Sequence, residues 1–157
     1  MKNAERVLAA TSINIVMVRG ACLWMIMALI LAWCMVGLNF GMPGLPDIFQ
    51  GKQTRVLQAH IDFLLMSALI LGYYATRVPF PWHVRWAMVV GAFTNSSLFL
   101  LMGMFPLLDR AEPPQHLAQH AFQYYLFASL IITSYGFGKG AVLILKSTLI
   151  EVDPRAQ

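Results

Sequence analysis

The chain has 157 residues, of which 59% are hydrophobic and only 11% are charged. This composition is typical of one membrane domain and excludes a separate soluble domain. The net charge of +4 is small and is spread over loops and termini, which indicates contact with a lipid bilayer and excludes a nucleic-acid-binding surface.

Four apolar segments are long enough to cross a bilayer as helices, which takes about 20 residues each. They cover about residues 20–40, 56–75, 84–107 and 116–145. Segments rich in proline or glycine separate them near residues 41–47, 79–82 and 109–115, and we interpret these as loops because proline interrupts a helix. The sequence therefore predicts an all-α membrane protein, an antiparallel bundle of four transmembrane helices that forms one domain over residues 1–157.

The second segment begins with a histidine, His60, about one turn inside the expected membrane boundary. A neutral imidazole there can bind a haem iron or another metal, act as an acid or base, or donate one hydrogen bond to a neighbouring helix. Asp62 lies two residues further on and so faces away from His60. We expect it to pair with a basic loop residue such as Arg55 or Arg110.

The third segment carries a polar residue, Asn95, near its middle. An unpaired amide in hydrocarbon is costly, so Asn95 must form a hydrogen bond with another helix or with a ligand. The fourth segment begins with His116 and His120, spaced four residues apart, followed by Tyr124. These two histidines are weaker candidates for a metal site, and the favoured alternative is that one or both contact water or lipid headgroups at the interface. Tyr124 is a candidate to donate its hydroxyl to a ligand, or an interfacial aromatic residue.

Lysine and arginine are distributed unequally between the two sides of the expected bundle. Eight lie with the termini and the second loop, and three lie on the other side: Lys2, Arg6, Arg19, Arg77, Arg85, Lys139, Lys146 and Arg155 against Lys52, Arg55 and Arg110. The positive-inside rule then places both termini in the cytoplasm. His60, His116 and His120 would all lie near the outer face.

Several of these features resemble the small four-span bacterial membrane isomerases that include styrene oxide isomerase, with hydroxylaminobenzene mutase as a possible relative. The shared features are the chain length, the four-span plan and a few short motifs. The motifs are the Pro43-Gly44 loop, Arg55 and Ala59-His60 at the start of span two, and Asn95 with Gly103 in span three. The resemblance covers about residues 35–105.

The resemblance implies a homotrimer in the bacterial inner membrane, with haem b held between protomers and His60 as the axial ligand of its iron. It also implies that the ferric iron acts as a Lewis acid in a redox-neutral rearrangement of a small apolar, aromatic epoxide-like substrate. We expect the substrate pocket beside His60, bounded by Met66, Asn95, Phe99 and Tyr124. Asn95 and Tyr124 would orient the substrate oxygen.

Two positions differ from the pattern of that family. Met66 stands where the family has an asparagine, and Phe99 stands where it has a tyrosine that orients the substrate. Three classes of function therefore remain open: a haem-dependent isomerase or mutase, a haem protein for electron transfer or sensing, and a metal-free membrane enzyme or assembly subunit. We expect the first.

Overall fold

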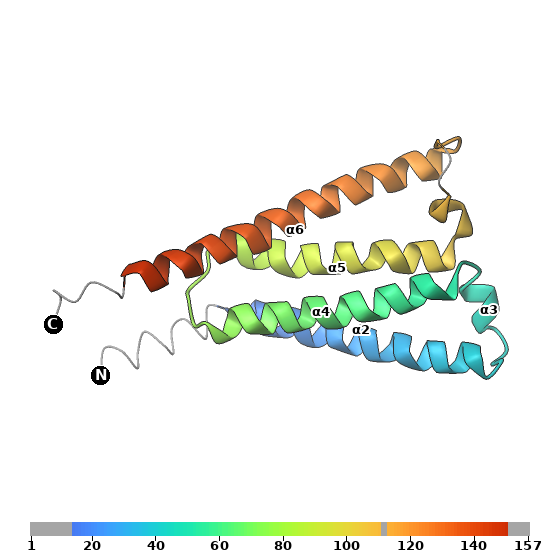
Figure 1. Ribbon diagram of the computed structural model, residues 1–157, viewed down its shortest axis with the longest axis horizontal. Coiled ribbons are helices and arrows are strands. Elements are labelled where there is room, and N and C mark those ends of the chain that lie inside the picture. The colour runs from blue at the N-terminus through green and yellow to red at the C-terminus, as the bar shows by residue number, and fades with distance from the viewer. Residues whose placement is uncertain (1–13, 111–112, 151–157) are drawn as a thin grey trace.

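Four long helices form the structure, a computed structural model that describes residues 14–110 and 113–150. They are α2 (Ile15–Asn39), α4 (Gln53–Ala75), α5 (Trp82–Met104) and α6 (Leu117–Ile150). Each is long and apolar enough to cross a membrane. Figure 1 shows them side by side, with consecutive helices running in opposite directions. The predicted all-α, four-helix membrane bundle is confirmed.

The helix bounds differ from the predicted spans by a few residues. Helix α2 begins five residues before the predicted start, and α6 continues to Ile150, five residues beyond the predicted end. The third span was expected to reach residue 107, but α5 ends at Met104 because Pro106 follows and begins the 3₁₀ helix η1 (Pro106–Asp109). The first loop contains one short helix, α3 (Leu45–Ile48), with a proline in its first turn.

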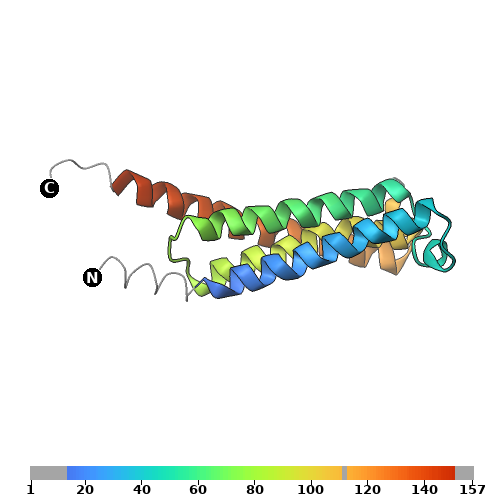
Figure 2. The same cartoon turned by 90° about the horizontal axis from the view of Figure 1, so that it is seen from below.

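The bundle has two distinct ends. We call the end where α2 begins and α6 ends the termini end, and the opposite end, which carries α3 and η1, the loop end; both views show this arrangement (Figures 1 and 2). Helix α2 packs against α4 and α5, while α6 packs mainly against α5. In Figure 1, α6 lies against α5 near the termini end and diverges from it toward the loop end.

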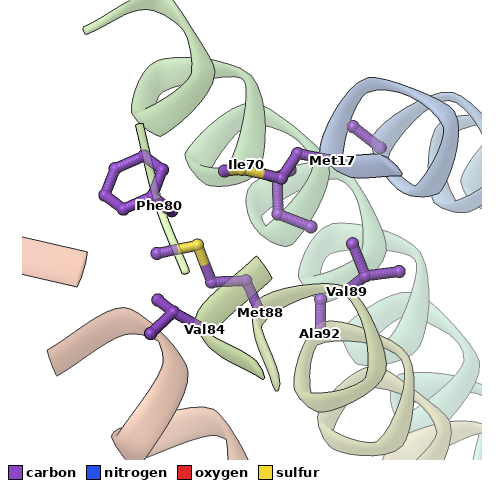
Figure 3. Packing of buried hydrophobic residues seen from close by; sticks show 8 residues of the cluster. Met17, Ile70, Phe80, Val84, Met88, Val89 and Ala92 are labelled. Carbon is purple, nitrogen blue, oxygen red and sulfur yellow. The ribbon is translucent and has the colours of Figure 1, made fainter. Parts of the chain in front are cut away.

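Two clusters of buried side chains hold the helices together. The cluster nearer the termini end joins α2, α4, α5 and the loop before α5, as Figure 3 shows; its members include Met17, Ile70, Phe80, Val84, Met88, Val89 and Ala92. The second cluster joins α2 and α4 nearer the loop end and consists of Ala28, Leu31, Val56, Ala59 and Phe63. Two alanines in this second cluster let the α2 and α4 backbones approach closely.

Small residues also set the contact between α5 and α6. A Cβ atom added at Gly91 would lie 2.8 Å from the Cα of Thr133, and one added at Gly136 would lie 2.7 Å from the backbone nitrogen of Met88. The Thr133 hydroxyl donates a hydrogen bond to the Gly91 carbonyl at 3.0 Å. Any larger side chain at either glycine would force these two helices apart.

An ion-pair cluster fastens the loop end. The carboxylate of Asp109 in η1 accepts a hydrogen bond from the Arg55 guanidinium, and its second oxygen lies 2.9 Å from the Lys52 ammonium. The Asp109 side chain is 7% exposed. The Arg55 hydrogen bond holds the pKa of Asp109 below its ordinary value, and Lys52 acts in the same direction while burial opposes both. The start of α4 is thereby tied to the loop that precedes α6.

Replacing Asp109 with Asn should destabilise the protein at pH 7 by about 1–2 kcal/mol, because charge-assisted hydrogen bonds are lost. A carboxyl whose pKa is lowered by folding stabilises the protein above its unfolded pKa, about 3.9, and this stabilisation is lost as pH falls through the folded value. Unfolding midpoints in detergent at pH 7 and below pH 4 measure both effects. Asp47→Asn, at an exposed position in α3, is the control, and equal losses in the two variants would contradict this role of Asp109.

Candidate functional site

His60 lies in α4, about 10 Å along the helix from its start at 1.5 Å per residue. Its Nδ1 atom lies 2.8 Å from the backbone carbonyl oxygen of Ala28 in α2. A carbonyl oxygen can only accept, so Nδ1 must carry the proton and donate it. In the neutral imidazole the lone pair is then on Nε2, which is the atom available to bind a metal ion or accept a proton.

The short distance between α2 and α4 makes this hydrogen bond possible. Ala28 and Ala59 are both fully buried in the cluster between these helices. With only methyl groups at these two positions, the half-buried His60 ring can reach a carbonyl that already belongs to the backbone ladder of α2. A carbonyl oxygen has two lone pairs, so Ala28 can accept this second hydrogen bond.

A cavity of about 530 Å³ lies between α2 and α4 on the loop-end side of His60. Its lining is mainly apolar, with a few polar groups: Ala32, Met35, Val36, Leu38, Asn39, Gln53, Thr54 and Leu57. Leu57 is one turn before His60 in α4, and Ala32 is one turn after Ala28 in α2. A cavity of this size and character is typical of small-molecule sites.

Asp62 and Asn95 pair with each other near the middle of the bundle. The Asn95 amide donates a hydrogen bond to the Asp62 carboxylate at 2.8 Å, which joins α4 to α5. Of the two partners expected for Asn95, another helix or a ligand, the structure shows another helix, α4. The expectation that Asp62 pairs with Arg55 or Arg110 is wrong: Arg55 lies at the helix start, two turns away, and bonds Asp109.

The other predicted pocket residues are spread over the bundle. Met66 packs against the cluster that contains Met17, and Phe99 packs against the cluster that contains Ala28. Tyr124 is 75% exposed on the outside of α6. The contacts within one chain therefore join neither Asn95 nor Tyr124 to His60.

The neighbouring tyrosine, Tyr125, is the one that reaches another helix. Its hydroxyl lies 2.7 Å from that of Ser97 in α5, and Tyr125 also lines an apolar cavity of about 490 Å³ between α5 and α6 at the loop end. Neither Ser97 nor Tyr125 is among the site residues predicted from the sequence. Two adjacent tyrosines give no sign of which one faces the bundle until the rotation of α6 about its axis is known.

His116 and His120 are exposed at the start of α6. Gln119, which lies between them, is buried instead; its side-chain oxygen accepts hydrogen bonds from the backbone of Gln115 and His116, and its amide donates to the Leu107 carbonyl. Within residues 14–110 and 113–150, no three His, Cys, Asp or Glu side chains gather as a metal site would require.

A polar cluster that was not predicted from the sequence lies at the termini end and contains one histidine, His83. The His83 Nδ1 atom is 2.8 Å from the Tyr135 hydroxyl, and the Lys139 ammonium donates a hydrogen bond to the same hydroxyl at 3.2 Å. Tyr135 and Lys139 are four residues apart in α6, a spacing that the sequence shows. Their contact with His83, 52 residues away, is a product of tertiary packing.

No protein-family model, curated protein or solved structure matches this chain.

Proposed function

We propose that the protein binds haem b through His60 and catalyses the redox-neutral isomerisation of a small apolar, epoxide-like substrate. The observation that carries this proposal is the hydrogen bond from His60 Nδ1 to the Ala28 carbonyl. Metal-binding histidines commonly donate their other ring N–H to a carbonyl or carboxylate, which fixes the ring and makes the free nitrogen more basic. His60 already has this arrangement.

Apolar surface beside His60 supports the proposal of a bound porphyrin. Exposed apolar side chains lie beside it along α4, among them Leu57, Ile61 and Leu65. They offer a surface for the macrocycle within the hydrocarbon layer, while the cavity between α2 and α4 is open on the same side of the helix as Leu57. Lys52, just before α4, is exposed, and the N–H donors that it retains beside its ion pair with Asp109 would suit a haem propionate.

When bound, ferric haem would supply a Lewis acid that polarises the oxygen of an epoxide. His60 would bind the iron through Nε2, and its hydrogen bond to the Ala28 carbonyl would fix the orientation of the ring. Asn95 and Tyr124 are the proposed hydrogen-bond donors that orient the substrate oxygen. Because Tyr124 is exposed on the outside of α6, it would serve a site on a neighbouring copy, which agrees with the homotrimer that the resemblance to isomerases implies.

A haem protein without isomerase activity is the second candidate. Its supporting observation is that Asn95 is engaged with Asp62. Met66 and Phe99, in addition, cannot donate a hydrogen bond to a substrate. In this alternative His60 still binds iron, and the protein would transfer electrons or sense a ligand.

The absorption spectrum of the detergent-purified protein tests both candidates. A Soret band, with conversion of an aryl epoxide to an aldehyde in the absence of a reductant, would support the isomerase. A Soret band without turnover would favour the second candidate. A folded protein that takes up no haem would contradict both.

We also propose that both termini are cytoplasmic, in the inner membrane of a bacterium. Among the described residues, the termini end carries five lysines and arginines and no carboxylate: Arg19, Arg77, Arg85, Lys139 and Lys146. The loop end carries Lys52, Arg55 and Arg110 together with Asp47 and Asp109. This asymmetry supports the orientation under the positive-inside rule.

Cysteine labelling tests this topology. In a background where Cys22 and Cys34 are replaced by Ser, a cysteine at Gln50 should react with an impermeant maleimide added outside intact cells. A cysteine at Lys146 should react only after the membrane is opened. The reverse pattern would overturn the proposed orientation.

A further inference from the structure

We propose that His83, Tyr135 and Lys139 form a binding site for the phosphate group of an anionic phospholipid at the termini end. Their contacts are those already described: the Tyr135 hydroxyl lies between the His83 Nδ1 atom at 2.8 Å and the Lys139 ammonium at 3.2 Å. The Lys139 ammonium also lies 5.3 Å from the centre of the Tyr135 ring. The three side chains come from two helices, the start of α5 and the C-terminal half of α6, and the site is independent of His60.

The free hydrogen-bonding groups of this cluster suit an anion. An ammonium group has three N–H donors, so Lys139 retains two after its bond to Tyr135. The neutral His83 ring leaves one more donor in either tautomer: the tyrosine O–H is free when Nδ1–H donates to Tyr135, and the His83 Nε2–H is free when Nδ1 accepts from Tyr135. The Lys139 ammonium is a charged donor, and hydrogen bonds from charged donors to phosphate are among the stronger ones in proteins.

The charge around the cluster favours an anionic lipid over a zwitterionic one. In the part of the chain that the structure describes, the termini end has no Asp or Glu. At the loop end, by contrast, Asp109 binds Lys52 and Arg55. The basic residues described at this end, which are Arg19, Arg77, Arg85, Lys139 and Lys146, favour a headgroup whose only charge is its phosphate, such as phosphatidylglycerol.

The position of the cluster favours a lipid over a soluble phosphate ester. Trp82, which is 68% exposed, lies edge-on to the His83 ring with ring centres 5.8 Å apart. Tryptophan is enriched at the level of lipid headgroups. One turn deeper than Tyr135 on the same face of α6, Ile131 is 69% exposed. A phosphate bound to the cluster would therefore have apolar protein surface directly below it for the acyl chains.

Native mass spectrometry of the full-length protein in detergent tests this site, with dioleoylphosphatidylglycerol and dioleoylphosphatidylcholine as probes. We expect phosphatidylglycerol to bind about tenfold more tightly than phosphatidylcholine. Lys139→Gln should remove most of this difference, because a charge-assisted hydrogen bond contributes about a factor of ten or more. Tyr135→Phe, which keeps the ring and loses the hydroxyl, should weaken binding by about threefold.

Lys146→Gln is the matched control, since it removes the same charge from the same helix, two turns beyond Lys139. It should change the affinity by less than about twofold. Equal losses in Lys139→Gln and Lys146→Gln would overturn the site and indicate only diffuse attraction. Equal binding of the two lipids would overturn it as well. Complete displacement of phosphatidylglycerol by millimolar inorganic phosphate would show that the phosphate comes from a soluble molecule and would overturn the lipid assignment.

Discussion

Under the proposed haem-binding function, replacing His60 with alanine should abolish most haem binding while leaving the four helices folded. Its imidazole is the only side chain for which we propose a strong bond to the iron, and a porphyrin without an axial ligand is held by apolar contact alone. The measurement is the ratio of Soret to protein absorbance in the purified variant, together with its helical circular dichroism. A folded His60→Ala protein with full haem occupancy would contradict the proposal that His60 binds the iron.

Two further variants separate iron binding from the packing of α2 against α4. His60→Gln retains a side-chain N–H that can donate to the Ala28 carbonyl but offers the iron only weak ligands. It should therefore preserve stability better than His60→Ala and lose haem to the same extent. His120→Ala, at an exposed position in α6, should keep both haem and stability. If His120→Ala loses haem and His60→Gln retains it, the iron ligand lies in α6.

Replacing Asn95 with alanine is expected to lower turnover by about 10²-fold without removing haem, which is the usual effect of losing one orienting donor. The same change takes away the hydrogen bond that Asp62 accepts from Asn95. The unfolding free energy in detergent should therefore fall by about 1–2 kcal/mol, because a polar group within the bundle is left without its partner. Full activity in the variant would show that Asn95 only joins α4 to α5.

A double-mutant cycle measures the energy of the Asp62–Asn95 pair. Asp62→Ala and Asn95→Ala should each destabilise the protein, and the double variant should be about 1 kcal/mol more stable than the sum of the two losses predicts. The reason is that removing both partners leaves neither group unpaired. Strict additivity would contradict a direct interaction. Thr94→Ala, one residue before Asn95, is a suitable control, because its hydroxyl bonds within its own helix to the Gly91 carbonyl.

The four helices were predictable from the sequence because their causes are local. The length of each apolar run sets whether it can span a bilayer, and the prolines near residues 43 and 79 interrupt a helix wherever the chain is placed. The errors fall at the ends: α2 and α6 extend further than hydropathy alone suggested, and α5 ends at Met104, three residues before the predicted end. Helix bounds depend on capping and on contacts with neighbouring elements, which an apolar average does not resolve.

The hydrogen-bond partners were not predictable in the same way. The sequence showed that His60 and Asp62 face in different directions, since they are two residues apart in one helix. It could not show that His60 faces Ala28 or that Asp62 faces Asn95, because these contacts span more than 30 residues and depend on how each helix is rotated about its axis. Without the rotation of each helix, charge alone suggests a basic loop residue as the partner of Asp62, and this prediction is wrong.

By itself, then, the sequence determined a four-helix membrane bundle and His60 as a candidate ligand, because apolar length and the cost of burying an imidazole follow from residue type alone. Only the tertiary structure decided which ring nitrogen of His60 is free, which tyrosine of the Tyr124–Tyr125 pair faces the bundle, and that His83 meets Lys139 through Tyr135. Each of these depends on the rotation and spacing of helices set by small residues at their contacts, such as Ala28 against Ala59 and Gly91 against Thr133.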